Sequence, residues 1–480
     1  MEAARFDDAA RLSEDAWERG WRRYEVAYAA ACAVSRGGKV DEALGWLQRS
    51  MDAGFPSIRW MDGDPDLAAV RADERYPAFL ERARLAHQRH LVEVNVGGGL
   101  ERSTPEAEGI DAAALRELLQ RAEATRSSAL VILRHGRLVG DWYFGGPSEL
   151  TETMSATKSV IALAIGLLLD DGKIPSLDEP VATWFPEWKD GVHDGITLRH
   201  LLSHTSGLHA DPHTTRIYAS PDFVRFALES PVDAPPGAEW FYNNSAVNLV
   251  AGVVERASGQ RMDVYLRERL FAPLGIREVQ WTLDRAGNPH CMAGLQIHAA
   301  DFAKLGQLML QGGTWEGKRI LSEAWIAAAT ASPSQELNSL CGLLWWLEAP
   351  RVDMVIDEPF LTALRDRGAD PAFLAKLTPL LDKAIPRSEF FAAVQRELGP
   401  GGMLQWGAEV APRRLSPRRV VTGDYDGYSA RGSFGQVLVV FPSRDLVAVR
   451  FTERFDGADP AVEFEDFRSL VRALAAPASR

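Results

Sequence analysis

Two segments far apart in this 480-residue chain have the pattern of β-hairpins. Residues 130–144 alternate apolar and other side chains on either side of His135-Gly136, and residues 437–451 do the same around a turn at 442–445. Such alternation around a short turn is typical of hairpins, whereas much of the sequence between them has helical spacing. Strands at both ends with helices between them predict an α+β fold. The two ends would form one antiparallel sheet flanked by helices, and the middle would form an inserted helical lobe.

The first 93 residues have a purely helical pattern. Residues suited to a buried face recur every three or four positions at Tyr24, Tyr28, Ala31 and Val34, and again at Leu44, Leu47 and Met51. Gly37-Gly38 separates the two segments, and Gly54 and Pro56 end the second. This arrangement resembles one tetratricopeptide unit, which cannot bury its own apolar face because helical repeats need about three copies. We therefore predict a small all-α domain over residues 1–93 that caps the next domain, with a peptide-binding arm as the alternative.

Glycine-rich residues 94–105 are predicted to be a linker, followed by a second domain over residues 106–480. Within that domain, residues 351–419 mix acidic and basic side chains and interrupt what would otherwise be a short connection. Three stretches of this insertion have helical patterns: 361–367, 371–383 and 388–398. An insertion of this size near a site can act as a lid or a specificity loop. The alternative is a surface decoration.

The composition excludes several classes of protein. Hydrophobic residues make up 46% and charged residues 25%, as in ordinary folded proteins, which excludes a largely disordered chain. The formal net charge of -13 argues against a nucleic-acid partner. One basic cluster is interpreted as a solvated loop: Arg413, Arg414, Arg418 and Arg419. Residues 1–23 lack the apolar core of a signal peptide, and the longest apolar run, 160–169, is shorter than the ~20 residues that span a bilayer. We therefore predict a soluble, cytoplasmic protein with no membrane partner.

The cysteine content also restricts the chemistry. Cys32, Cys291 and Cys341 are too few and too widely spaced for a disulfide framework or for the paired cysteines of a structural zinc site. We predict no bound metal and no cofactor, so any chemistry would come from the side chains of the protein itself.

The strongest chemical signal is Ser155-Ala156-Thr157-Lys158, followed by the apolar run 160–169. On a helix this spacing puts the lysine amine one turn from the serine hydroxyl, on the same face. The N-terminus of the helix adds free N–H groups and the positive end of the helix dipole, which both favour a developing oxyanion. A serine needs an adjacent base to be a nucleophile at neutral pH, and a lysine can serve where burial disfavours its charged form. The pattern therefore predicts Ser155 as a nucleophile and Lys158 as its base.

Longer segments carry a resemblance to a known family. They are Asp171–Val181, Ile196–Leu208, Pro236–Ser245 and Ala300–Gln307, together with Gly312-Gly313 and Gly317–Ile320. With the Ser-x-x-Lys motif, they resemble the serine β-lactamase and penicillin-binding-protein-like hydrolases over roughly residues 104–475, apart from the insertion. The resemblance implies a class C β-lactamase-like fold and a chiefly structural role for His204.

A second motif of that family is matched by Tyr242-Asn243-Asn244, which has the form Tyr-x-Asn. The resemblance implies that Tyr242 relays protons between the serine and the leaving group. It also implies that Asn244 either donates a hydrogen bond to the substrate carbonyl or orients Lys158.

A third motif departs from the family. Where β-lactamases and peptidases carry Lys-Thr-Gly, this chain has Gly427-Tyr428-Ser429, followed by Ala430 and Arg431. The missing lysine weakens both the β-lactamase and the peptidase assignment. Arg431 is the candidate substrate-binding residue in its place, although its guanidinium is larger and planar and is not a like-for-like replacement. The pattern is more similar to the esterase and aminohexanoate-oligomer hydrolase branch, which implies that the backbone N–H groups of Ala430 and Ser155 bind the oxyanion. Trp345 and Trp346 are predicted to be core aromatic residues or, as often in this family, part of the substrate cleft.

The predicted function is hydrolysis of a small-molecule ester or amide through an acyl-enzyme on Ser155, with an ester as the first choice. Two alternatives remain open. The acyl group could instead pass to an amine or an alcohol, because the second nucleophile decides between hydrolysis and transfer. The domain could also be an inactive binding module whose helical arm, residues 1–93, recruits a protein partner.

Overall fold

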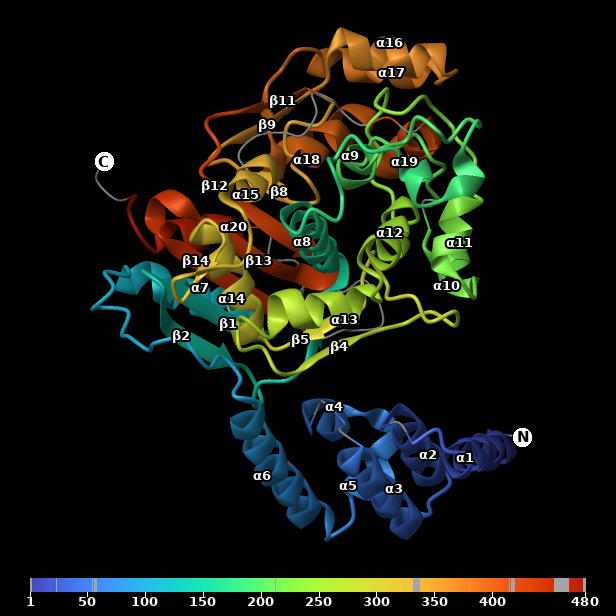
Figure 1. Ribbon diagram of the computed structural model, residues 1–480, viewed down its shortest axis with the longest axis vertical. Helices are drawn as coiled ribbons and strands as arrows, with labels where there is room; N and C mark the ends of the chain where they lie inside the picture. Colours follow the sequence, from blue (N-terminus) through green and yellow to red (C-terminus); the bar gives the residue numbers. More distant parts are fainter. Residues whose placement is uncertain are drawn as a thin grey trace.

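In the computed structural model the chain forms a large body that contains the main sheet and a smaller group of N-terminal helices beside it (Figure 1). The structure describes residues 2–22, 24–53, 55, 58–211, 213–330, 337–413, 415, 419–452 and 466–477. Arg414 and Arg418 of the basic cluster, and Gly54 and Pro56, lie outside these residues. Within the described ranges, no helix is both long enough and apolar enough to cross a membrane.

A six-stranded antiparallel sheet is the frame of the large body, with the strand order β2-β1-β14-β13-β12-β8. The strands are β1 (Ser127–Arg134), β2 (Arg137–Tyr143), β8 (Trp346–Glu348), β12 (Gly427–Gly432), β13 (Gln436–Phe441) and β14 (Leu446–Thr452). The two predicted hairpins are β1–β2 and β13–β14, and they meet because β1 pairs with β14, with Val131 opposite Val449. The prediction that the two ends of the domain form one sheet is therefore confirmed.

Alternating side chains give this sheet two apolar faces. The helices over them are α7 (Ala112–Ala124), α8 (Thr157–Asp170), α14 (Ala299–Leu310) and α20 (Phe467–Ala473). Val131 and Val440 belong to the core that contains α8 and α14, whereas Ile132 and Val439 belong to the core that contains α7 and α20. Helix α8 is buried on all sides from its first residue to Leu168, which is expected of a helix that is hydrophobic all round. The residues at its N-terminus are therefore held by a helix that is enclosed in the core.

A lobe of short helices packs against α8 in the same core, as predicted. Its elements are η3 (Val181–Thr183), η4 (Pro186–Trp188), α9 (Leu198–Leu202), α10 (Thr215–Ala219), α11 (Phe223–Leu228), η5 (Ala246–Asn248), α12 (Leu249–Ser258), α13 (Met262–Leu266) and η6 (Arg267–Phe271). The remaining elements of the body are β3 (Thr151–Glu152), β4 (Val279–Trp281), β5 (Leu295–Ile297), β6 (Thr314–Trp315), β7 (Lys318–Arg319) and α15 (Glu323–Thr330). Strands β3, β5 and β4 form a small antiparallel sheet, and β3 leads directly toward Ser155.

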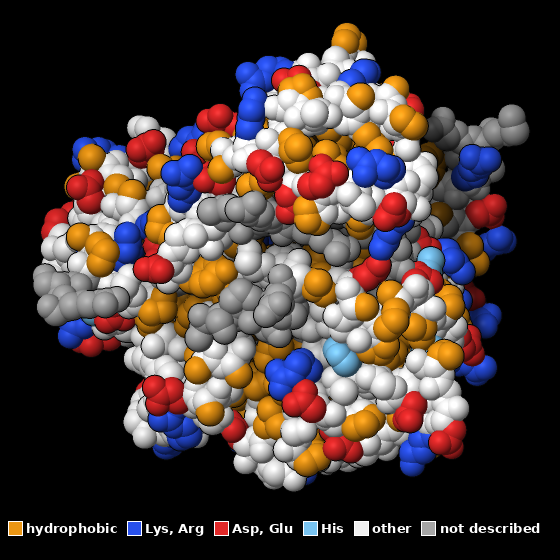
Figure 2. All heavy atoms as spheres, turned by 90° about the horizontal axis from the view of Figure 1, so that it is seen from above, with side chains coloured by type: hydrophobic (Ala, Val, Ile, Leu, Met, Phe, Trp, Pro, Cys, Tyr) orange, Lys and Arg blue, Asp and Glu red, His pale blue; other side chains and the backbone are white. Residues whose placement is uncertain are grey.

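The insertion at 351–419 folds around a core of its own that includes Phe360, Phe373, Phe390 and Trp406. Its helices are α16 (Glu358–Asp366), α17 (Pro371–Leu377), η7 (Thr378–Leu380), α18 (Arg387–Leu398), α19 (Gly402–Val410) and η8 (Ala411–Arg413). It also contains a three-stranded sheet that the sequence did not predict, with the order β10 (Ile385–Pro386), β9 (Val352–Val355) and β11 (Arg419–Thr422). The insertion lies at the opposite end of the molecule from the N-terminal helices (Figure 1), and charges of both signs are interspersed on the face seen in Figure 2.

The N-terminal helices have a separate core that includes Tyr28, Leu47 and Phe79. They are α1 (Glu2–Glu18), α2 (Tyr24–Arg36), α3 (Val40–Asp52), α4 (Ile58–Gly63), η1 (Pro65–Leu67), α5 (Ala68–Arg71) and α6 (Tyr76–Val94). Helices α2 and α3 cover the two segments of helical periodicity and pack against each other. The tetratricopeptide assignment and the boundary at residue 93 stay predictions.

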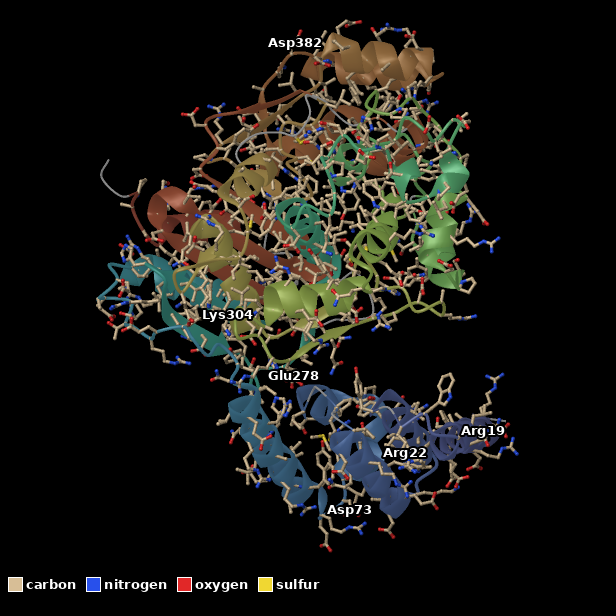
Figure 3. The ribbon with its side chains drawn as sticks, in the orientation of Figure 1. Arg19, Arg22, Asp73, Glu278, Lys304 and Asp382 are labelled. Carbon is tan, nitrogen blue, oxygen red and sulfur yellow. The ribbon has the colours of Figure 1, made fainter. Side chains whose placement is uncertain are left out.

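Helix α6 connects these helices to the body through a small polar cluster. Glu278, labelled in Figure 3, lies at the edge of the body and accepts hydrogen bonds from His90 of α6 at 2.9 Å and from His298 at 3.0 Å. His87 of α6 lies 2.8 Å from the carbonyl oxygen of Ser148. Burial raises the pKa of Glu278, but the two imidazole groups outweigh this effect and hold it below its ordinary value. The predicted linker that follows α6 runs along the body, where the Gly97 N–H donates to Asp301 at 3.0 Å.

Candidate active site

Ser155 lies in a tight turn, the 3-10 helix η2 (Met154–Ala156), which leads into α8. The residue before it, Met154, has a φ of 49°, a left-handed conformation that is uncommon for a residue with a side chain. Such strained residues cluster at functional sites, where the surrounding structure holds them in place. The turn is closed by a hydrogen bond from the Ala156 N–H to the Thr153 carbonyl at 3.1 Å. The half-buried Ser155 therefore has a fixed position at the N-terminus of a fully enclosed helix.

Lys158 lies one turn further along the same face, as the spacing predicts. Its side chain is 2% exposed, and its Nζ lies 3.0 Å from Ser155 Oγ and 2.7 Å from the carbonyl oxygen of Met292. Both partners are neutral, so the amine is held in place without a carboxylate among its recorded contacts. This arrangement places a buried amine in hydrogen-bond contact with a serine hydroxyl, which is the geometry that a base and its nucleophile require.

Tyr242 comes from the loop between α11 and η5, far from Ser155 in the sequence. The centre of its ring lies 4.9 Å from Lys158 Nζ. The loop is anchored on the turn that follows α9, because the Phe241 N–H donates to the His204 carbonyl at 2.9 Å and the Gly237 N–H donates to the Thr205 carbonyl at 2.8 Å. The structure therefore brings Ser155, Lys158 and Tyr242 together, as expected from the resemblance.

His204 supports this loop. Its Nδ1 accepts a hydrogen bond from the Asn243 N–H at 3.2 Å, and its ring lies 4.6 Å from that of Tyr242. Burial, with a smaller contribution from the charge of Lys158, lowers the pKa of His204 to about 3. The imidazole is therefore neutral at physiological pH, and its contacts are those of a structural residue.

Strand β12 lies against the turn that carries Ser155. Gly432, at the end of this strand, has no room for a side chain: a Cβ there would lie 2.3 Å from the Thr153 carbonyl oxygen and 3.2 Å from the Ala156 nitrogen. Ala430 lies two residues earlier on the same strand and is fully buried. Its N–H stays the predicted second oxyanion donor.

Replacing Gly432 with alanine should lower kcat/KM by about 100-fold, because the new Cβ meets backbone atoms and must displace β12 or the turn at Ser155. A misplacement of about 1 Å can cost this much. The measurement is ester hydrolysis together with the melting temperature. Gly45→Ala is the matched control, since a Cβ there meets nothing within 4 Å. Unchanged hydrolysis by the Gly432 variant would show that the contact does not position Ser155.

Arg431 is occupied by the protein itself. Its guanidinium pairs with Glu348 and donates to Ser429 Oγ at 2.8 Å. Glu348 also accepts from Arg468 of α20 at 3.1 Å. Burial raises the pKa of Glu348, but the two guanidinium groups outweigh it and hold the pKa below its ordinary value. Arg431 is thus tied into a buried ionic network, and it lies over the ring of Trp346, 5.6 Å from its centre.

The other two predicted residues have different surroundings. Trp345 is 1% exposed and packs edge-on against Tyr428 at 5.6 Å, and it also lines the cavity beside Ser155. It is therefore both a core residue and part of the site wall. Asn244 is half-buried, and its carbonyl oxygen accepts from Asn248. The hydrogen bonds of Lys158 in this structure are with Ser155 and Met292. Both implied roles of Asn244, the contact with the substrate carbonyl and the orientation of Lys158, stay predictions.

A cavity of about 10 Å³ connects these groups. Its lining residues are Ser155, Lys158, His204, Tyr242, Cys341, Leu344, Trp345 and Trp346. Sequence reasoning missed two parts of the site: the Met292 carbonyl and Cys341. A backbone carbonyl leaves no side-chain signal, and a lone cysteine carries no motif. Trp346 lines the cavity together with Trp345, as the resemblance implied for both residues.

The described residues contain one group that could hold a metal ion, and it lies in the N-terminal helices rather than at this cavity: Cys32, Asp64 and Asp66. Asp64 already accepts hydrogen bonds from Tyr28 Oη at 2.8 Å and from Cys32. The polar groups that line the cavity include a hydroxyl, an amine, a phenol, a thiol and the imidazole of His204, a set that suits acid–base and nucleophilic chemistry.

Comparison of the sequence with known proteins identifies a family and several relatives. The model of the Beta-lactamase family matches residues 113–471. A 6-aminohexanoate-dimer hydrolase of Paenarthrobacter ureafaciens is 29% identical over 47% of this chain and 63% of its own length. Esterase EstB of Burkholderia gladioli is 30% identical over 36% of this chain and 53% of its own length. The chain thus spans less than two thirds of either relative.

A transferase and a solved structure extend the comparison. Monacolin J acid methylbutanoyltransferase of Aspergillus terreus is 38% identical over 42% of this chain and 55% of its own length. The crystal structure of a "putative beta-lactamase" from Bacteroides dorei matches 76% of this chain and 99% of its own, with a TM-score of 0.53. Because the two sequences are 17% identical, this similarity shows a shared fold alone.

Proposed function

Since this chain belongs to the Beta-lactamase family, we propose that it is a serine hydrolase that cleaves a small-molecule ester or amide through an acyl-enzyme on Ser155. The observation that carries the proposal is the 3.0 Å contact between Lys158 Nζ and Ser155 Oγ at a buried cavity. The relatives named as an esterase and as a 6-aminohexanoate-dimer hydrolase support the same class of reaction. An ester is the first choice of substrate.

The first step is acylation. Lys158 Nζ accepts the proton of Ser155 Oγ, and the oxygen forms a bond to the carbonyl carbon of the substrate. The carbonyl oxygen becomes an oxyanion, which the N–H groups of Ser155 and Ala430 would stabilise; one such donor is typically worth about 10²–10³ in kcat. The carbon–oxygen or carbon–nitrogen bond of the substrate then breaks. Tyr242 delivers a proton to the leaving group and is reprotonated from Lys158, so the proton taken from the serine leaves with the alcohol or amine.

The second step releases the acyl group. A water molecule attacks the acyl carbon while Tyr242 and Lys158 accept its proton, and the bond to Ser155 Oγ breaks as that oxygen regains a proton. The product is a carboxylic acid. Arg431 does not supply a free cation for a substrate carboxylate, because Glu348 and Ser429 occupy it. We therefore expect β-lactamase and peptidase activity to be weak at most.

Acyl transfer is the second candidate. The relative that is 38% identical is named as a methylbutanoyltransferase, and transfer would use the same acyl-enzyme with an alcohol or amine in place of water. A protein partner for residues 1–93 is part of the alternative binding-module hypothesis.

The test is reaction of the full chain with a fluorophosphonate, followed by intact-mass measurement and peptide mapping. We expect one adduct, on Ser155, and none in Ser155→Ala. Product analysis with added alcohols and amines then separates hydrolysis from transfer. A folded protein that acquires no adduct on Ser155 would contradict the proposal and favour the binding module.

A further inference from the structure

The cavity beside Ser155 is too small for most acyl groups. At about 10 Å³, it has room for roughly one water molecule, which needs 10–15 Å³ by the same measure. A substrate must place its acyl substituent beside Ser155 Oγ while its carbonyl carbon is attacked. An acyl chain longer than a methyl group can therefore enter this cavity only if part of its wall moves.

One wall of the cavity, residues 341–345, is fixed. The Leu344 N–H donates to the Leu202 carbonyl at 2.9 Å, and the Leu344 carbonyl accepts from Ser159 Oγ at 2.6 Å. Gly342 approaches α15 so closely that a Cβ there would lie 2.1 Å from the Ala329 carbonyl oxygen. These bonds tie the segment to α8, α9 and α15 at once. The side chains that it presents to the cavity are buried: Cys341, Leu344 and Trp345.

Two other residues that line the cavity, Lys158 and His204, are also fixed in position. Both are buried, and each is held by the hydrogen bonds described above. Tyr242 is half-buried, but the main chain before and after it is anchored to His204, and its phenol is needed for proton transfer.

Trp346 is different, because it is half-buried and belongs to β8, a short strand at the edge of the sheet. Its ring stacks on that of Tyr242 at 6.3 Å and 20°, and lies 6.3 Å from that of Trp240. Arg431, fixed by Glu348, lies over the ring and contacts it through a cation–π interaction. The ring is thus held across the cavity by one stacked, one edge-to-face and one cation–π contact. Among the described residues these are contacts of the ring rather than hydrogen bonds of its side chain, so its rotation toward solvent would break ring contacts alone.

We propose that Trp346 determines the size of the acyl group: the closed site accepts short acyl chains, and longer chains react only when this ring turns outward. The proposal rests on the proposed function, because it concerns the acyl group that Ser155 receives. It identifies the substrate class as esters or amides of short-chain acids.

The experiment measures kcat/KM of the full chain for p-nitrophenyl acetate, butyrate and octanoate. We expect the wild type to lose at least about 10-fold between acetate and butyrate, since one methylene in a close-fitting apolar pocket changes kcat/KM by about 10–200-fold. Trp346→Ala should raise the octanoate-to-acetate ratio at least 10-fold. Trp346→Leu, which retains an apolar side chain on β8, should give an intermediate ratio and provides a second variant if the alanine variant does not fold.

Trp142→Ala is the matched control. Trp142 is also a half-buried tryptophan on an edge strand, β2, at the other side of the same sheet. Its replacement should leave the chain-length ratio unchanged. Labelling rates with ethyl- and octyl-substituted fluorophosphonates should show the same dependence on Trp346, without a contribution from deacylation.

Three outcomes would overturn the inference. Turnover by the wild type with a flat chain-length profile, or a profile that Trp346→Ala leaves unchanged, would overturn it while the proposed function stands. The absence of turnover with all three esters, together with the absence of an adduct on Ser155, would overturn the proposed function and this inference with it.

Discussion

Replacing Ser155 with alanine should lower ester turnover by about 10⁵-fold or more, to the level of the uncatalysed reaction plus what binding and the oxyanion donors contribute. Loss of the nucleophile in a comparable serine enzyme costs about 2 × 10⁶ in kcat. Here the hydroxyl is the group that Lys158 Nζ contacts at 3.0 Å, and among the described residues the phenol of Tyr242 is the one other hydroxyl that lines the cavity. The measurement is initial-rate hydrolysis of p-nitrophenyl acetate.

The control is Ser258→Ala, which removes a hydroxyl at the end of α12 that donates to the Gln260 carbonyl at 3.1 Å. Both variants should unfold at nearly the same temperature as the wild type. Turnover by Ser155→Ala at the wild-type rate, in a sample free of other esterases, would refute the acyl-enzyme scheme.

Replacing Lys158 with methionine should lower turnover by about 10³-fold or more and abolish rapid labelling by fluorophosphonate. A positioned general base contributes about 10²–10⁴-fold, and groups that act as a unit show larger, non-additive effects. The double variant Ser155→Ala, Lys158→Met should therefore be no less active than Ser155→Ala alone. Additive losses would show that the two residues act independently.

The same substitution has an expected effect on stability. Lys158 is buried, and its recorded partners are a hydroxyl and a carbonyl rather than a carboxylate. Methionine has a similar length and carries no amine that must be desolvated. We expect the melting temperature of Lys158→Met to equal or exceed that of the wild type, as is common where a site is optimised for activity at the expense of stability. A decrease of several degrees would show that the lysine is a structural residue.

Lys304 shows what a structural buried lysine looks like in the same protein. It is 0% exposed and pairs with Asp301, itself 1% exposed, at 2.7 Å within α14. Asp301 also accepts from the Gly97 N–H after α6. In this ion pair the carboxylate of Asp301 balances the charge of the ammonium group. The amine of Lys158 instead contacts a hydroxyl and a backbone carbonyl, which are both neutral. The contrast between the two lysines supports the assignment of Lys158 as the base.

The elements that the sequence predicted best are those with strong local patterns. The hairpins around His135-Gly136 and residues 442–445 formed as expected, because alternation and turn residues act within a few positions. In the insertion, the helices at 361–367, 371–383 and 388–398 correspond to α16, α17 and α18. The sequence analysis did not predict helix α19 or the sheet of β9, β10 and β11. The three strands have two to four residues each, and such short segments show too little periodicity to be recognised.

By itself, the sequence determined the relation between Ser155 and Lys158, because three residues along a helix place two side chains on one face whatever the rest of the fold does. It also determined that the two ends of the domain would supply strands. Only the tertiary structure decided that the Met292 carbonyl holds the amine, that Glu348 occupies Arg431, and that Trp346 closes the cavity. These contacts join residues far apart in the chain, so they depend on how helices and sheet pack. No local spacing encodes that packing.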